Sequence, residues 1–522
     1  MAQDHDGLVA DLLRPEAYEP PVEEVELVET HISWVFLAGA YAYKLKKPVE
    51  LGFLDFRGLE DRLHFCCEEL RLNRRLAPEI YLDLAGAQHG PKGWRMAAWI
   101  EGSEPAVRMH RFPADARLDR RLEAGLLGGT ELEAFARSLA AFQAEAARAS
   151  VGQGLGDATA ATRPALENFR VLSGPGLGPE PAAQIEALAA WTRQRASALA
   201  ARFEARLAAG FVREGHGDLH LANLVRLPNR VAAFDGIEFD PALRWIDLQS
   251  DVAFLLMDLE SRGRCDLGWQ FYNAWLAAGG DYEGLDLLDW YLVYRHLVRA
   301  KVDGIRLGQP GLQPAEAARL RDRQLRHIFL AAQRATRDPP LLILTSGYSG
   351  SGKSWLAARL ARLLPAVWLR SDVERKRLHG LDPLTSAAAL PGAGLYSEEA
   401  TARTYARLAE LARTAIGAGL HLVVDAAFLD SRRREEFLRL GTRLGARPVV
   451  LACMASPELL RQRVAGRRGD PSDAGLAVLE SQLGHPIEIG NFEAGLRIEV
   501  DTSRELQPPA LAGQLLRRRR DG

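Results

Sequence analysis

The sequence predicts two domains of different fold class, an α+β domain over residues 1–335 and an α/β domain over residues 336–522. The chain has 522 residues, more than one hydrophobic core usually supports. Asp338, Pro339 and Pro340 mark the boundary, because paired prolines cannot continue a helix. Beyond them, short apolar runs alternate with helical segments, and this pattern indicates a parallel sheet covered by helices on both faces.

The beginning of the chain predicts a small sheet with one helix. Residues 22–49 contain the runs VEEVELVET, ISWVFLA and AYAYKLKKPV, which are rich in strand-forming residues. Residues 60–76 have helical periodicity, which Pro78 ends. Two short strands follow near residues 80–84 and 94–99, and most of the sequence from about residue 115 to residue 335 is helical in pattern. Together these segments predict the α+β domain.

Composition favours a protein of the reducing cytoplasm. The N-terminus is acidic where a signal peptide is basic, and no apolar run approaches the length of a membrane helix. Four cysteines are too few and too scattered for a disulfide framework. Lys and Arg total 66 and Asp and Glu total 68, so the net charge of −2 provides no overall field for a nucleic acid. We expect no membrane partner and no nucleic-acid partner, and the composition leaves the oligomeric state open.

A phosphate-binding loop opens the second domain. The segment GYSGSGKS matches GxxxxGK[ST] between a predicted strand, LLILTS, and a predicted helix. In such a loop the glycines let backbone N–H groups face a phosphate, Lys353 holds the β- and γ-phosphates during transfer, and Ser354 ligates Mg²⁺. The expected contacts to ATP are Gly347, Gly350, Ser351, Gly352, Lys353 and Ser354.

Two carboxylates are expected near this loop, because they follow the ends of buried strands. Asp425 ends the strand in HLVVDAAF, and we expect it to bind the metal or its water, since an unpaired charge there is costly. Asp372, in LRSDVERKR, follows the preceding strand at the edge where such sheets bind ligands. Asp372 is a candidate catalytic base for the accepting hydroxyl, with Arg375 nearby to hold substrate, or alternatively the N-cap of the next helix.

A cluster of arginines follows in LRQRVAGRRGDPSDAG. A lid that brings arginine to the transferred phosphoryl group has this composition, and Arg463 and Arg467 are the expected phosphate contacts. A solvated helical face has the same composition, so the alternative stays open. With these motifs, residues 340–505 resemble the small P-loop kinases of the gluconate kinase and chloramphenicol phosphotransferase type, which are AAA-type domains. The resemblance implies phosphorylation of a metabolite.

The first domain contains HGDLHLAN, in which Asp218 and Asn223 have the spacing of a kinase catalytic loop. The segment resembles that loop in the aminoglycoside phosphotransferase family. The resemblance implies that Asp218 accepts or orients the hydroxyl proton and that Asn223 reaches Mg²⁺. After a predicted hairpin, Asp235 in AFDGIEF matches the metal-binding Asp of the DFG position. Asp247 and Asp251, further on, are expected either to form an acidic rim for a substrate or to cap a helix.

The same resemblance implies a protein-kinase-like bilobal fold, with an N-lobe over about residues 20–112 and a helical C-lobe over 113–335. AYAYK places Lys44 as the phosphate-binding lysine, with Lys46 on the same strand face as its rival. Glu69 is the preferred partner of that lysine, with Glu68 as the alternative. The segment ETHISW replaces the usual glycine-rich loop. The order of the two domains matches a group of bacterial proteins that fuse such a domain to a P-loop kinase.

These features predict a bifunctional enzyme that uses ATP and Mg²⁺ at two sites. Each site is expected to transfer the γ-phosphoryl group to a hydroxyl of a small polar metabolite, such as a sugar or an aminoglycoside-like alcohol. Two alternatives stay open. One domain is a regulatory nucleotide-binding module and only the other is an active kinase, or the P-loop domain phosphorylates the 5′-hydroxyl of a polynucleotide.

Overall fold

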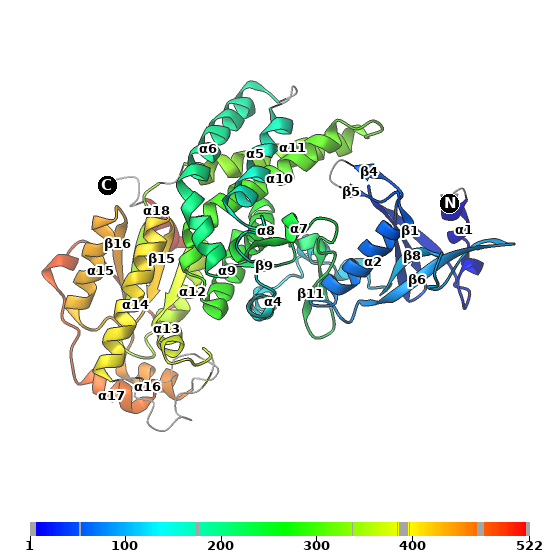
Figure 1. Ribbon diagram of the computed structural model, residues 1–522. Coiled ribbons are helices and arrows are strands. Elements are labelled where there is room, and N and C mark those ends of the chain that lie inside the picture. The colour runs from blue at the N-terminus through cyan, green and yellow to red at the C-terminus, as the bar shows by residue number, and fades with distance from the viewer. Residues whose placement is uncertain are drawn as a thin grey trace. The chain divides into compact units, whose positions relative to one another are not determined.

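The computed structural model describes residues 7–51, 54–173, 177–336, 338–383, 385, 395, 397–466 and 474–517 (Figure 1). The chain forms two compact units, each made of several segments. Unit 1 comprises Met1–Ser138, Phe142–Pro164 and Ala196–Leu255, and unit 2 comprises Leu139–Ala141, Ala165–Arg195 and Leu256–Gly522. Helices that follow Leu256 therefore belong to the same compact unit as the C-terminal sheet. The boundary expected at residues 335 and 336 stays a prediction.

Unit 1 begins with a six-stranded antiparallel sheet in the order β1-β2-β3-β8-β6-β7. Its strands are β1 (Val25–Glu29), β2 (Ser33–Ala38), β3 (Tyr41–Lys46), β6 (Tyr81–Gly90), β7 (Gly93–Ala98) and β8 (Glu104–His110), with a small pair β4 (Glu50–Leu51) and β5 (Leu54–Asp55) beside them. Successive side chains along each strand point to opposite faces of the sheet, and apolar side chains are buried on both faces. Helix α1 (Leu8–Leu12) packs on one face, and α2 (Leu59–Asn73) packs on the other through Cys66 and Leu70.

The rest of unit 1 is helical apart from two short strand pairs. The helices that lie wholly in unit 1 after the sheet are α3 (Leu118–Glu123) and α7 (Pro241–Arg244). Four further helices belong partly to each unit: α4 (Gly129–Glu145), α5 (Ala158–Leu172), α6 (Pro179–Ala208) and α8 (Leu248–Ser261). The pairs are β9 (Val212–Glu214) with β12 (Trp245–Asp247), and β10 (Leu224–Arg226) with β11 (Val231–Ala233). The β10–β11 hairpin returns the chain, so that the Phe234 N–H donates to the Asn223 carbonyl at 3.0 Å.

Unit 2 contains a five-stranded parallel sheet in the order β14-β15-β13-β16-β17. The strands are β13 (Leu341–Ser346), β14 (Ala366–Arg370), β15 (His421–Asp425), β16 (Arg447–Met454) and β17 (Arg497–Asp501). Every residue of β13 is buried, as expected for a central parallel strand covered on both faces. The loop that leaves β13 therefore emerges beside the end of β15, where Asp425 lies.

Helices cover both faces of this sheet (Figure 1). Helices α12 (Lys353–Leu363) and α18 (Pro508–Arg517) pack on one face, and α14 (Glu398–Gly417) and α15 (Ser431–Arg443) pack on the other. The remaining helices of unit 2 are α9 (Cys265–Gly279), α10 (Leu288–Leu307), α11 (Pro314–Ala335), α13 (Ser371–Leu378), α16 (Pro457–Ala465) and α17 (Leu476–Leu483). Helix starts follow local capping: the Ser397 and Ser456 hydroxyls accept backbone N–H groups of the first turns of α14 and α16. No helix in the described ranges combines the length and apolarity that crossing a membrane requires.

Helix α9 covers the open edge of the parallel sheet. The buried Asn273 side chain donates to the Ala366 carbonyl at 2.9 Å and accepts the Trp368 N–H at 2.8 Å. An asparagine amide thus replaces the neighbouring strand that edge strand β14 lacks. Arg377 of α13 also donates to the Ala277 carbonyl at the end of α9, at 2.6 Å.

We expect Asn273→Ala to lower the free energy of unfolding by about 2–3 kcal/mol, because two backbone groups at the sheet edge lose their partner. The change is measured as a shift in the urea midpoint followed by circular dichroism. Gln333→Ala, at an exposed position of α11, is the matched control and should leave the midpoint in place. An unchanged midpoint for Asn273→Ala would mean that solvent satisfies this edge as well as the amide does.

Two candidate phosphotransfer sites

The loop after β13 wraps tightly, and its glycines are required. Gly347 has φ 145°, and a Cβ there would lie 2.4 Å from the Cys453 carbonyl oxygen. Gly350 has φ 80°, and a Cβ there would lie 2.8 Å from the Leu460 carbonyl oxygen. Helix α12 starts at Lys353, directly after Gly352, so its N-terminus points into the loop. The Lys353 ammonium folds back over the loop and donates to the Tyr348 carbonyl at 2.7 Å.

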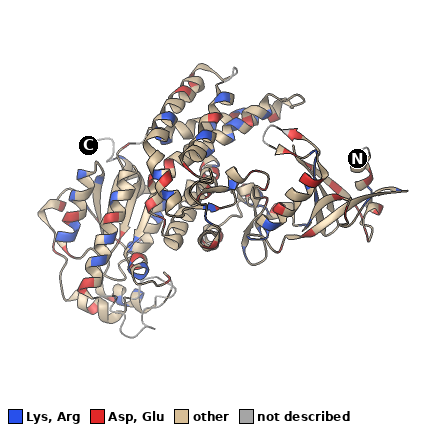
Figure 2. Cartoon of the chain, viewed as in Figure 1, with Lys and Arg blue, Asp and Glu red and all other residues tan. Residues whose placement is uncertain are grey.

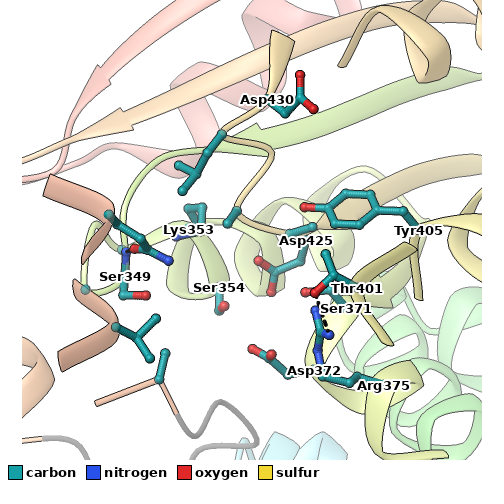
Figure 3. Close-up of a pocket in the computed structure, with 18 of the residues that line it drawn as sticks. Ser349, Lys353, Ser354, Ser371, Asp372, Arg375, Thr401, Tyr405, Asp425 and Asp430 are labelled. Carbon is teal, nitrogen blue, oxygen red and sulfur yellow. Dashed lines mark hydrogen bonds between the residues drawn. The ribbon is translucent and has the colours of Figure 1, made fainter. Parts of the chain in front are cut away.

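The loop lines a cavity of about 500 Å³. Figure 3 shows the side chains of Ser354, Asp425 and Asp372 pointing into this space from three different elements. Among the loop residues, Gly350, Gly352, Lys353 and Ser354 line the cavity, whereas Gly347 and Ser351 shape the loop behind it. A volume of this size accommodates a nucleotide phosphate chain with a small acceptor.

Asp425 is 5% exposed, and burial raises its pKa although Arg370, the Ser354 hydroxyl and Lys353 lower it. A buried carboxylate that is costly to ionise gains from a divalent cation beside it. Its neighbour Ser354 supplies a hydroxyl oxygen, and hard oxygen ligands of this kind suit Mg²⁺. Ser354 and Asp425 therefore fit the magnesium role expected for them.

Asp372 is the second residue of α13 and lines the cavity. The N-cap of α13 is Arg370, which lies in an extended conformation, so Asp372 does not fill the alternative capping role. Arg375, one turn further, donates to the Leu395 carbonyl at 2.7 Å and to the Thr401 hydroxyl at 3.2 Å (Figure 3). The helix thus places one carboxylate and one guanidinium on the same wall.

Arg463 lies on α16 and lines the cavity, but its guanidinium donates hydrogen bonds to other groups of the protein. It donates to the Thr502 carbonyl at 2.7 Å, to the Thr502 hydroxyl at 3.0 Å and to the Gly350 carbonyl at 3.4 Å. Arg463 therefore anchors the phosphate-binding loop to Thr502, directly after the end of β17. Arg467, the second arginine expected at the phosphates, lies outside the described residues.

Several cavity residues were missed by sequence reasoning. One of them, Ser349, belongs to the phosphate-binding loop, and the others lie further along the chain, on α14, on α15 and its N-cap, and on α17: Thr401, Tyr405, Asp430, Arg433 and Gln482. Arg433 lies 4.5 Å above the ring of Tyr405, which pairs a residue of α15 with one of α14. The Asp430 carboxylate also caps α15 by accepting the Arg432 N–H. The phosphate-binding motif was the local signal for Ser349 and helix capping the one for Asp430, whereas the helical residues among them carry no such signal.

The second site lies in unit 1, and its centre is a buried ion-pair network. The Lys44 ammonium lies 2.9 Å from Oε1 of Glu69 and 2.5 Å from Oδ1 of Asp235. Lys46 contacts the other Glu69 oxygen at 2.5 Å and also pairs with Glu238. Glu69 and Lys46 are fully buried, whereas the Asp235 side chain is 46% exposed. Lys44 is thus the lysine that bridges the buried Glu69 carboxylate of α2 and the more exposed Asp235 carboxylate.

Glu68 and the acidic pair of α8 have other partners. Glu68 pairs with Arg71 at 2.8 Å and with Arg244, away from Lys44. The Asp251 carboxylate accepts the N–H groups of His216 at 3.1 Å and Gly217 at 3.0 Å. Asp247 binds Arg206 at 2.5 Å. Asp251 therefore holds the backbone of the loop before Asp218, and neither aspartate forms a solvent-facing rim.

The electrostatics of Glu69 give a pH-dependent prediction. Burial raises its pKa, but Lys44 and Lys46 outweigh burial and lower the pKa to about 2. A carboxyl whose folded pKa lies below its unfolded pKa stabilises the fold above the unfolded value, and this contribution disappears as pH falls towards the folded value. We expect Glu69→Gln to cost about 3 kcal/mol near neutral pH, and less as pH drops below about 4.5.

Urea unfolding of the wild type and Glu69→Gln, followed at several pH values, measures this difference. Glu186→Gln, at an exposed position of α6, is the control and should show a small difference at every pH. A Glu69→Gln penalty that stays constant down to about pH 3 would contradict the lowered pKa.

The catalytic-loop residues are in direct contact. The Asn223 amide nitrogen donates to Oδ2 of Asp218 at 2.9 Å, and the His220 ring lies 3.3 Å from the same oxygen. Since Nδ1 of His216 accepts the Asp218 N–H, Nε2 carries the proton and donates to the Phe234 carbonyl at 3.0 Å. Burial lowers the pKa of His216, which favours this neutral form. The loop is thus tied to the segment that carries Asp235.

The turn that replaces the glycine-rich loop is short. Strands β1 and β2 pair up to Glu29 and Trp34, and the Thr30 N–H donates to the Ser33 carbonyl at 2.9 Å. The Thr30 hydroxyl accepts the Ser33 N–H at 3.0 Å, and Lys47 binds Glu29 at 2.6 Å. This turn is a closed hairpin without glycine, unlike the extended loop that covers phosphates in most kinases.

In the part of the chain that the structure describes, no three His, Cys, Asp or Glu side chains gather to hold a metal on their own. Mg²⁺ differs from zinc in that it is usually bound by one or two carboxylates together with substrate phosphates. Asp235 and Asn223, whose loops join through the Phe234 N–H, offer a carboxylate and an amide oxygen to such a cation. The residues of unit 1 therefore fit a metal that arrives with a nucleotide.

Comparison with known proteins found a family match, similar curated proteins and similar solved structures. An AAA domain family matches residues 342–485. The chain is 31% identical over 481 residues to the "Uncharacterized protein Rv2004c" of Mycobacterium tuberculosis, covering 92% of this chain and 93% of that protein. A gluconokinase structure from Sinorhizobium meliloti 1021 covers 36% of this chain and 97% of its own, at 21% identity and a TM-score of 0.26. A choline/ethanolamine kinase family protein from Mesorhizobium loti covers 59% of this chain and 92% of its own, at 12% identity and a TM-score of 0.34.

The predicted fold class is confirmed in both halves. In the C-terminal half, the five-stranded parallel sheet and the AAA domain family match at residues 342–485 show a P-loop domain. In the N-terminal half, the antiparallel sheet with its single helix α2 precedes the helical region that carries the Asp218 loop.

Proposed function

Because the chain belongs to one family with the Mycobacterium tuberculosis protein Rv2004c over nearly its whole length, we propose one function for the entire two-domain chain. It is an ATP-dependent phosphotransferase with two active sites. Each site transfers the γ-phosphoryl group to a hydroxyl of a small polar metabolite, with Mg²⁺ as cofactor. The observation that carries this proposal is the presence of two separate sets of phosphate-handling residues, one in each unit.

In unit 1, the residues divide the work of transfer between them. Lys44, oriented by Glu69, is placed to bind the phosphate chain, and Asp235 and Asn223 to bind the metal. When bound, Mg²⁺ would neutralise part of the negative charge of the phosphates. Asp218, fixed by Asn223 and His220, is placed to orient the acceptor hydroxyl and take its proton. The buried lysine stays charged, because Asp235 and Glu69 outweigh burial and raise the pKa of Lys44 well above its usual range.

In unit 2, the phosphate-binding loop and the N-terminus of α12 are placed to hold the triphosphate, with Lys353 against its outer phosphates. Ser354 and Asp425, which both line the cavity, would hold the metal of this site. Asp372 lines the same cavity as the loop and would receive the acceptor proton, and Arg375 on the same helix and Arg433, which also lines the cavity, would bind the acceptor. The main task of these residues would then be to hold ATP and the acceptor in the geometry for direct transfer, without a covalent intermediate on the protein.

A small acceptor suits the surface better than a polynucleotide. Figure 2 shows Lys and Arg interspersed with Asp and Glu over the described helices. The sequence carries 66 basic and 68 acidic residues, and a polyanion needs a continuous basic strip. Polynucleotide kinase activity is therefore the weaker alternative.

One observation favours a second candidate function. The turn between β1 and β2 is a closed hairpin at Thr30, and it provides no flexible glycine-rich cover for nucleotide phosphates at that position of unit 1. A nucleotide bound there without transfer would make unit 1 a regulatory module for the P-loop kinase. Turnover that survives Asp218→Asn unchanged, together with loss of one of two ATP-binding sites in Lys44→Ala, would favour this candidate.

The proposal is tested with the purified full chain, γ-labelled ATP, Mg²⁺ and a pool of small hydroxyl metabolites. Label should enter two products, one lost in Asp218→Asn and the other lost in Lys353→Ala. If the double variant Asp218→Asn with Lys353→Ala transferred label as fast as the wild type, the proposed function would be wrong. Mass spectrometry of the labelled products then identifies the acceptors.

A further inference from the structure

The backbone of Asp235 adopts a conformation that needs support. Its φ is 61°, in the left-handed region that residues other than glycine rarely occupy. Its carboxylate is pulled towards Lys44, 2.5 Å away. Strained backbone persists where the surroundings hold it in place. The residues that hold Asp235 therefore decide where its carboxylate lies.

Two buried side chains hold this segment, and each binds one of two consecutive amides. The Tyr81 hydroxyl accepts the Asp235 N–H at 3.0 Å. The Asn73 amide oxygen accepts the Gly236 N–H at 2.7 Å. Tyr81 and Asn73 are each only 2% exposed, so water does not compete for these hydrogen bonds. The contact is close, because a Cβ on Gly236 would lie 3.4 Å from the Asn73 oxygen.

Both holding residues come from the N-terminal sheet and its helix. Tyr81 opens β6, and Asn73 ends α2, one helical turn after Glu69. The Asn73 amide nitrogen also donates to the Glu69 carbonyl at 2.9 Å. The helix that orients Lys44 through Glu69 therefore also fixes the backbone of the carboxylate that Lys44 faces.

We propose that Asn73 and Tyr81 are positioning residues for the metal ligand Asp235, and that they set the affinity of unit 1 for a divalent cation. This inference rests on the proposed function of Asp235. Neither residue touches the nucleotide or the acceptor in this role. Each keeps the Asp235 backbone in the left-handed conformation from which its carboxylate faces Lys44. Without them the segment relaxes, and the carboxylate must be reordered each time a cation binds.

The test measures metal binding and does not depend on knowing the acceptor. Mn²⁺ is used as the paramagnetic probe, with the ATP analogue AMP-PNP, and free Mn²⁺ is read by electron paramagnetic resonance. The full chain carries Lys353→Ala and Ser354→Ala, so that the P-loop site contributes little. In this background we expect Tyr81→Phe, which removes one oxygen atom, to weaken Mn²⁺ binding about fivefold. Asn73→Leu should weaken it by at least as much.

Tyr43→Phe is the matched control, because it removes the same atom from β3, where Tyr43 packs with the face that α1 covers. It should leave the Mn²⁺ dissociation constant unchanged. A purely structural role for Tyr81 or Asn73 would lower the melting temperature without changing the dissociation constant of the folded protein. Wild-type Mn²⁺ affinity in both Tyr81→Phe and Asn73→Leu would overturn the inference.

Asp235→Asn separates this inference from the function on which it rests. If Asp235→Asn weakens Mn²⁺ binding strongly while the Tyr81 and Asn73 variants do not, Asp235 is a metal ligand that needs no such support. If Asp235→Asn leaves Mn²⁺ binding intact, the proposed metal site of unit 1 fails, and the positioning role fails with it.

Discussion

Lys353→Ala is expected to lower phosphoryl transfer at the C-terminal site by about 10³-fold and to leave transfer at the N-terminal site intact. The ammonium lies beside the phosphate-binding loop, where it donates to the Tyr348 carbonyl at 2.7 Å. An incoming phosphate offers a charged acceptor in place of that neutral carbonyl, which is the stronger hydrogen bond. Alanine removes this charge from a cavity where water screens poorly, so charge developing on the transferred group loses its main partner.

The measurement is the initial rate of label transfer in a chain that also carries Asp218→Asn, which silences unit 1. Arg359→Ala is the matched control, since it removes a positive charge from the same helix while Arg359 stacks on Trp355 and does not line the cavity. It should keep the wild-type rate. A Lys353→Ala rate within about tenfold of the wild type would show that the loop does not bind the reacting phosphates.

Local sequence was sufficient to predict most of the C-terminal domain. Each apolar run became a parallel strand, and the central strands β13 and β15 are buried because helices cover both of their faces. The phosphate-binding loop could be predicted because its backbone needs glycine at fixed positions. At Gly347 and Gly350, φ is positive and a Cβ would lie too close to a backbone carbonyl oxygen. The residues on the acceptor side of the cavity could not be predicted from the sequence. Tyr405 and Arg433 meet only when α14 and α15 pack on the sheet, and ordinary helical sequence surrounds both.

In the N-terminal domain, spacing was enough to place charged residues on one face but could not show how they share partners. Lys44 and Lys46 lie two apart on β3, so their side chains point the same way, and both bind Glu69. The sequence presented them as rivals, yet Lys46 is a buried partner of Glu69 and Glu238 while Lys44 reaches Asp235. Which lysine faces the exposed carboxylate depends on the Asp235 segment, and that segment is positioned by Asn73 and Tyr81 far away in the sequence.

Asp218→Asn is expected to lower transfer at the N-terminal site by about 10³-fold, in a chain where Lys353→Ala silences the other site. Asparagine keeps the size of the side chain, but its amide cannot take a proton from an acceptor hydroxyl. The substitution also disturbs the contact with Asn223, whose amide nitrogen donates to the carboxylate at 2.9 Å. If the new side chain turns its own NH₂ towards Asn223, two donors meet and the loop loses a hydrogen bond.

The two consequences can be told apart by comparing Asp218→Asn with Asn223→Ala. Loss of the proton acceptor lowers kcat and leaves the affinity for Mg²⁺ and ATP nearly unchanged, whereas loss of Asn223 removes a metal ligand and raises the Mg²⁺ concentration needed for half-maximal rate. Asp115→Asn, at an exposed position, is the control for removing one negative charge and should behave as the wild type. Since Asp251 fixes the loop backbone from α8, Asp218→Asn should leave the fold in place. A full N-terminal rate in Asp218→Asn would assign the proton to another group and remove Asp218 from the chemistry.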